Sequence, residues 1–135
     1  VQKLVEKAGE RVKFTGYIEN QKLYRYYQSA DIQVIPSLWE EAAGLIAIEG
    51  MLSGLPLIIT KSGGMIEYAP SNVAVWIDRD NIIPNLEAAI IQLADDKEKR
   101  KEMSELSLEQ AKEFPKKKFY EDYIEVFEHE GTRKR

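Results

Sequence analysis

Two glutamates and a glycine between them are the residues of this sequence best suited to bind a ligand. Glu41 and Glu49 are separated by seven residues, and Gly44 lies in that interval. Glycine lets a ligand approach the backbone closely. The free N–H groups of Gly44, Leu45 and Ile46 are expected to face outward at the positive end of a helix. This arrangement suits an anion such as a diphosphate.

The two carboxylates suit hydroxyl groups rather than the anion itself. Glu49 is expected about 7.5 Å beyond Gly44 along the helix axis, where its carboxylate could accept hydrogen bonds from a diol. Glu41 could do the same on the opposite side of the phosphates, so that each glutamate binds one end of a nucleotide sugar. The alternative for Glu49 is an ordinary solvated position. Glu41 and its neighbour Glu40 could both be ordinary charges that favour a helix N-terminus, and Glu41 is preferred as the ligand because only Glu41 gives the right register.

The elements that must position these residues alternate between strands and helices. Apolar strands are predicted over 31–37, 56–60 and 74–77, a shorter alternating strand over 11–16, and helices over 1–8, 20–30 (with Asn20 as N-cap) and 43–53. This alternation indicates βαβ units and therefore an α/β, Rossmann-like parallel sheet with helices on both faces. Ligands of such sheets lie beyond the carboxyl ends of the strands, often at helix N-termini. Gly44 stands at such a junction.

The remaining sequence is predicted to be a loop followed by a helical C-terminal segment. Ser62-Gly63-Gly64 is interpreted as a glycine loop. After the last strand, apolar residues recur at spacings of three and four over 83–93, 103–110 and 119–127, which indicates helices. Pro115 separates the last two of them.

The composition is that of one soluble domain and excludes several classes of site. The chain has 135 residues, one histidine, no cysteine and a net charge of −4. Without cysteine there are no disulfides, thiolate zinc sites or iron–sulfur clusters, and no metal site is expected. The charge gives no support for binding nucleic acid. No stretch approaches the roughly 20 apolar residues of a membrane span, and the first residues do not form a signal peptide.

The neighbours of the two glutamates resemble glycosyltransferase family 4 (group 1), in which retaining enzymes carry a pair of glutamates at this spacing. The resemblance covers roughly residues 4–128. The matching positions are Gly16-Tyr17-Ile18, Leu23 to Tyr27, Ala30-Asp31, Pro36-Ser37, Glu41-x-x-Gly44-Leu45, Glu49-x-Met51-x-x-Gly54-x-Pro56 and Gly63-Gly64-x-x-Glu67.

The resemblance implies the C-terminal, donor-binding half of a GT-B fold, here residues 1–135. In that family the first glutamate contacts the donor sugar and the second binds the ribose hydroxyls, which makes Glu41 the catalytic and sugar-binding residue and Glu49 the ribose ligand. The diphosphate would then lie on the backbone of 44–46 (Gly44, Leu45 and Ile46), and Tyr17 and Ile18 would line the base pocket. A UDP-sugar is the expected donor, and no metal or other cofactor is expected.

The sequence departs from the family in several places. Ala43 stands where phenylalanine is common, and Gly50 stands where alanine is common. The family's arginine and lysine that clamp the diphosphate, and its acceptor-binding N-terminal domain, would precede Val1. We therefore expect the chain to be a fragment truncated at its N-terminus and inactive alone. A C-terminal helix over 116–129 is expected to pack on the absent domain.

The function that this resemblance implies is sugar transfer, with retention of configuration, to a glycan or lipid-linked acceptor. We expect a cytoplasmic enzyme of cell-surface polysaccharide or lipopolysaccharide synthesis. The basic cluster Lys116-Lys117-Lys118 is interpreted as a solvated face, with peripheral contact to anionic lipid as the alternative. Another alternative is a non-catalytic nucleotide-binding or docking module of the same fold. A phospho-acceptor signalling domain is disfavoured, because Asp31 begins its strand and Asp78 stands alone.

Overall fold

The computed structural model describes residues 7, 9–40 and 44–114, and within them a parallel α/β sheet. The sheet has the strand order β1 (Gln33–Ile35), β2 (Leu57–Thr60) and β3 (Ala74–Ile77), so β2 is the central strand. Every residue of β2 is buried, which explains its unbroken apolar sequence. The predicted fold class is confirmed.

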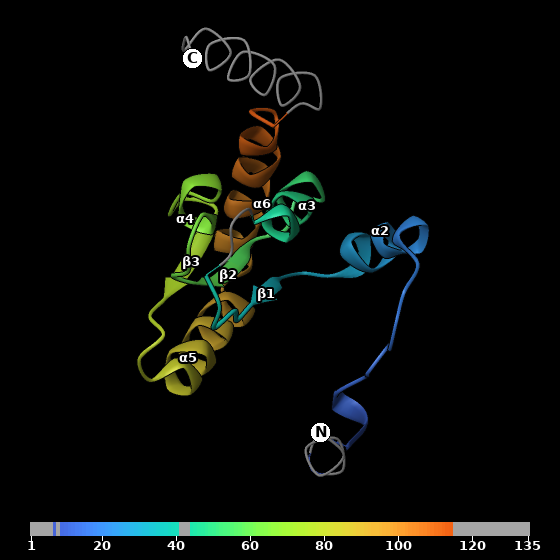
Figure 1. Ribbon diagram of the computed structural model, residues 1–135, viewed down its shortest axis with the longest axis vertical. Coiled ribbons are helices and arrows are strands. Elements are labelled where there is room, and N and C mark those ends of the chain that lie inside the picture. Colours follow the sequence, from blue (N-terminus) through green and yellow to red (C-terminus); the bar gives the residue numbers. More distant parts are fainter. Residues whose placement is uncertain (1–6, 8, 41–43, 115–135) are drawn as a thin grey trace, which may run out of the picture.

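Helices cover both faces of this sheet, as the residues of β2 show (Figure 1). Leu57 and Ile59 belong to the core beneath α3 (Leu45–Leu52) and α4 (Met65–Tyr68), the connections on either side of β2. Ile58 belongs to the core beneath α5 (Ile82–Asp95), which follows β3. This division follows from the alternation of side chains along a strand.

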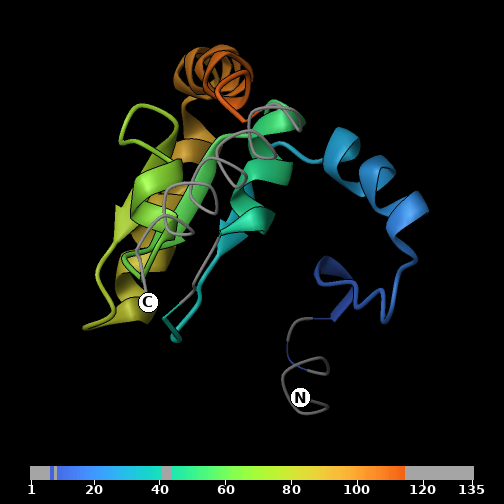
Figure 2. The same ribbon diagram turned by 45° about the horizontal axis from the view of Figure 1, so that its top comes forward.

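Helix α6 (Lys97–Ala111) crosses the amino ends of the strands, on the side away from the loops that follow them (Figure 2). Met103 lies in the core on the side of α5, and Ala111 lies in the core on the side of α3. The buried hydroxyl of Ser107 donates a hydrogen bond to the carbonyl oxygen of Leu55 at 2.9 Å. The carboxyl ends of the strands are therefore left to the loops and to the N-terminus of α3.

The predicted strand over 11–16 is wrong. The structure has a 3₁₀ turn, η1 (Gly9–Arg11), followed by an irregular segment that leads into α2 (Asn20–Ser29). A strand needs a neighbour for its hydrogen bonds, and no strand of the described residues pairs with this segment. Val12 and Phe14 accordingly stay 46% and 59% exposed.

Smaller differences concern the ends of elements. The N-cap of α2 is Glu19 and not Asn20, because Glu19 has the extended backbone and its carbonyl oxygen accepts the N–H of Lys22 at 2.8 Å. The strand predicted over 31–37 is reduced to the three residues that pair with β2, and Pro36, which follows them, has no N–H.

The single turn of α4 was not predicted, because four residues are too few to carry a helical pattern. Apart from Lys7, the predicted helix over 1–8 lies outside the described residues, as does the one over 116–129.

The contact between Gly50 and Gln33 yields a test of the packing between α3 and β1. A Cβ atom on Gly50 would lie 1.7 Å from Oε1 of Gln33. We expect Gly50→Ala to lower the free energy of unfolding by about 2 kcal/mol, as overpacking does. In a Gln33→Ala background the same substitution should cost clearly less, because the contact with Oε1 is gone and only the end of the Leu57 side chain, 2.9 Å from the new Cβ, must shift. Urea unfolding of the four variants measures both values, and an equal loss in both backgrounds would contradict this packing.

Candidate functional site

The loops that follow the three strands are tied together at the carboxyl edge of the sheet. The hydroxyl of Thr60 donates to the carbonyl oxygen of Ser37 at 2.5 Å, which joins the end of β2 to the loop after β1. Nε of Arg79, after β3, donates to the carbonyl oxygen of Lys61 at 2.9 Å. The guanidinium of Arg79 also pairs with the carboxylate of Glu40. These contacts fix the loop that leads toward α3.

Glu40 is committed to this ion pair. The hydrogen bond from Arg79 lowers the pKa of the Glu40 carboxyl, which favours the charged form that pairs with the arginine. Glu40 therefore helps to hold the loop in place. This agrees with the preference for Glu41 over Glu40 as the residue that binds the donor. Glu41, with Ala42 and Ala43, lies outside the described residues, and its catalytic role stays a prediction.

The N-terminus of α3 lies at the carboxyl end of β1, where the anion site is predicted. Gly44 is buried, and a Cβ atom there would lie 2.5 Å from Cγ of Met65, so only glycine lets α3 begin this close to α4. The carbonyl oxygen of Gly44 accepts the N–H of Ala47 at 2.8 Å. The amides of Gly44, Leu45 and Ile46 precede the first intrahelical donor, so they have no acceptor within the helix. The structure thus brings the three predicted phosphate ligands together.

Glu49 lies on the same helix, and its carboxylate is exposed and held by a tyrosine. The hydroxyl of Tyr27, on α2, donates to Oε2 of Glu49 at 2.9 Å. Burial raises the pKa of Tyr27 to about 12, together with the hydrogen bond from the hydroxyl to Glu49 and the charge of that carboxylate. Glu49 therefore has a defined hydrogen-bond partner. The alternative of an ordinary solvated position does not predict such a partner.

A buried amide lies beneath this pair. Gln33 is 9% exposed, and its Nε2 donates to the carbonyl oxygen of Ile46 at 3.1 Å. Gln33 also lowers the pKa of Tyr27, against the larger effects that raise it. The pattern of the sequence predicts no contact of Gln33 or Tyr27 with this helix. One polar residue in an otherwise apolar strand was the available signal.

Tyr17 and Ile18 are not brought to this helix terminus. They lie in the segment before α2, on the far side of α2 from α3 in both views (Figures 1 and 2). Tyr17 is 91% exposed. Their assignment to a base pocket stays a prediction.

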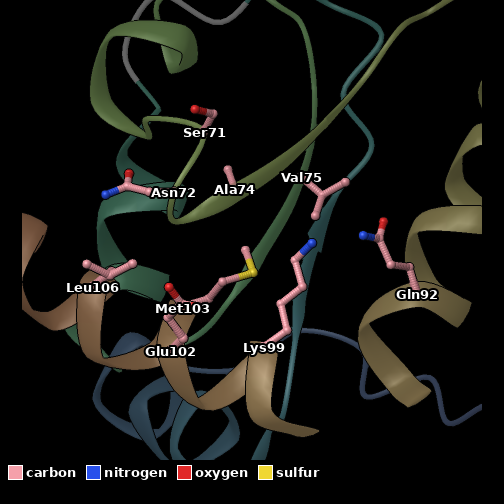
Figure 3. Close-up of a pocket in the computed structure, with 9 residues that line it drawn as sticks. All are labelled: Ser71, Asn72, Ala74, Val75, Gln92, Lys99, Glu102, Met103 and Leu106. Atoms are coloured by element: carbon pink, nitrogen blue, oxygen red, sulfur yellow. The ribbon is translucent and has the colours of Figure 1, made fainter. Parts of the chain in front are cut away.

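A separate hollow of about 360 Å³ lies at the opposite, amino end of β3 (Figure 3). It is lined by the loop before β3, by α5 and by α6, with Asn72, Gln92 and Lys99 among its polar residues.

The described ranges contain no cluster of three or more histidine, aspartate or glutamate side chains that could hold a metal ion. Within the same ranges, no helix has the length and apolar character needed to cross a membrane.

Comparisons with known proteins identify one family. The family model described as glycosyl transferases group 1 matches residues 1–110. An uncharacterized glycosyltransferase of Methanocaldococcus jannaschii is 35% identical over 50% of this chain and 17% of its own length. A D-inositol 3-phosphate glycosyltransferase of Corynebacterium diphtheriae is 32% identical over 77% of this chain and 24% of its own length. The chain thus spans a quarter or less of these relatives.

A solved structure with a similar fold also matches this chain. Sucrose-phosphate synthase from Thermosynechococcus elongatus superposes with a TM-score of 0.80 and 26% identity. The match covers 95% of this chain and 34% of that one.

The tyrosine–glutamate contact predicts a specific pH dependence of stability. The folded state raises the pKa of Tyr27 from 10.0 to about 12, so it favours the neutral phenol. The resulting stabilisation is complete below pH 10 and is lost as the pH rises through about 12. When the free energy of unfolding is measured with urea between pH 10 and about pH 12, it should fall less steeply with pH for Tyr27→Phe than for the unmodified chain. The exposed neighbour Tyr26→Phe is the matched control and should keep the original slope. Parallel slopes for the unmodified chain and Tyr27→Phe would contradict the contact.

Proposed function

Since the chain belongs to the glycosyl transferases of group 1, we propose that it forms the donor-binding part of a retaining glycosyltransferase. The observation that carries this proposal is the placement of a buried glycine at the N-terminus of α3, with a positioned carboxylate further along the same helix. A helix N-terminus binds anions through its amides and its dipole. A carboxylate accepts the hydroxyl groups of a sugar.

In this proposal the diphosphate of a nucleotide sugar lies against the amides of Gly44, Leu45 and Ile46. These amides stabilise the negative charge that develops on the leaving diphosphate as the bond to the sugar breaks. Glu49 accepts hydrogen bonds from the ribose hydroxyls. Glu41 contacts the transferred sugar, and the segment of Tyr17 and Ile18 supplies part of the base pocket.

The donor is proposed to be a UDP-sugar, bound without a metal ion. Backbone amides can neutralise part of the phosphate charge, which is the task that a metal ion performs elsewhere. The proposed acceptor is a glycan or a lipid-linked sugar in cell-surface polysaccharide or lipopolysaccharide synthesis, in the cytoplasm and with peripheral contact to the membrane. One relative named above is a D-inositol 3-phosphate glycosyltransferase and another is a sucrose-phosphate synthase, so similar proteins act on different compounds.

A non-catalytic docking module is less consistent with this site. A docking surface does not require a carboxylate held by a tyrosine beside a helix N-terminus, and this arrangement is what a polar, hydroxyl-bearing ligand needs.

Calorimetric titration of the chain with UDP, GDP and ADP tests the proposed donor site. We expect UDP to bind, and Glu49→Gln to weaken its affinity on the order of tenfold, because a neutral amide accepts hydrogen bonds from the ribose less strongly than a carboxylate. Glu87→Gln, at an exposed carboxylate on α5, is the matched control and should bind like the unmodified chain. Equal UDP affinity in the Glu49 and Glu87 variants would refute the role assigned to Glu49.

A further inference from the structure

Among the residues that the structure describes, one hydrogen bond holds the carboxylate of Glu49. Its Oε2 accepts the hydroxyl of Tyr27 at 2.9 Å. An ionised carboxylate has two oxygens and about four lone-pair sites, so this bond leaves Oε1 and further lone pairs without a partner in the described ranges. An exposed glutamate on a helix otherwise moves among several side-chain conformations. The bond to Tyr27 selects one of them before any ligand arrives.

We propose that Tyr27 is a positioning residue that presents Oε1 of Glu49 to a vicinal diol such as that of a ribose. The inference rests on the proposed function, because it takes Glu49 as the ligand of the hydroxyl groups. It adds a residue from α2, an element that contributes no other side chain to the site as described. A contact that is already ordered reduces the entropy lost on binding, so the tyrosine should increase affinity without touching the ligand.

Gln33 holds the phosphate end of the site through one buried amide. Its Nε2 donates to the carbonyl oxygen of Ile46, in the turn of α3 that is proposed to hold the diphosphate. Tyr27 holds Glu49, further along the same helix. The first turn of α3 and its later carboxylate are therefore each held by a side chain from outside the helix.

The orientation of this amide is fixed by its surroundings. Oε1 of Gln33 is buried without a hydrogen-bond partner among the described residues, and it lies against the backbone of Gly50. Such an oxygen costs free energy. Turning the amide over would place that oxygen against the carbonyl oxygen of Ile46, which repels it. The amide is thus held as a donor, and Gly50 provides the room for it.

Tyr27 also makes the diol site depend on the position of α2. The ring of Tyr27 packs against the core beneath α3, whereas most of α2 stands apart from the sheet (Figure 1). The neighbouring Tyr24 and Tyr26 are 49% and 46% exposed. Tyr27 is therefore the tyrosine of this helix that reaches the site.

The test compares UDP with 2′-deoxy-UDP, which lacks one hydroxyl of the diol, by calorimetry on the unmodified chain, Tyr27→Phe and Glu49→Gln. The unmodified chain should prefer UDP on the order of fivefold, the effect of about one hydrogen bond. Tyr27→Phe, which keeps the ring, should lose most of this preference by weakening UDP and leaving 2′-deoxy-UDP nearly unchanged. Tyr26→Phe is the control on the same helix and should keep the full preference.

The outcomes separate this inference from the proposed function. If Glu49→Gln abolishes the preference for UDP and Tyr27→Phe weakens both nucleotides equally, Tyr27 has only a structural role and the positioning proposal is wrong. If the preference for UDP survives in Glu49→Gln, or if neither nucleotide binds the unmodified chain, the donor role of Glu49 fails and the positioning role fails with it. Loss of the preference in both variants supports both proposals.

Discussion

The close packing of α3 against its neighbours is the constraint on which the candidate site depends. Side chains are excluded at Gly44 by Met65 and at Gly50 by Gln33. The first exclusion lets the helix begin directly at the edge of the sheet, with its free amides beside the loop from β1. The second makes room for the buried amide of Gln33, which donates to the carbonyl oxygen of Ile46. A larger residue at either position would move the helix and with it both proposed ligand groups.

This packing also determines which charges are available to an anion. Among the described residues at the carboxyl edge, the basic side chains are Lys61 and Arg79, and they are paired with Asp78 and Glu40 respectively. Their positive charge is largely used to hold the loops. Within the described part of the chain, the groups that the proposed site offers to phosphates are therefore the backbone amides and the dipole of α3, which require the accurate placement of that helix.

The sequence predicted the elements that carry their own pattern and missed the contacts that arise from packing. The apolar runs of β2 and β3 and the start of α3 beside Gly44 were predictable, because burial on both faces and a glycine at a strand–helix junction leave clear signals. The segment over 11–16 has the alternation of a strand, but pairing is not encoded locally, and the segment has no neighbour among the described strands. The contact between Tyr27 and Glu49 joins residues 22 positions apart, and no spacing rule connects them.

The most direct test of the donor site is an NMR titration of the chain with UDP, which locates the ligand residue by residue. The account predicts that the amide resonances of Leu45 and Ile46, at the N-terminus of α3, shift most as UDP is added. Amides around the hollow at the amino end of β3, such as those of Asn72 and Lys99, should stay unchanged. Shifts that gather around this hollow and leave α3 unperturbed would contradict the central claim.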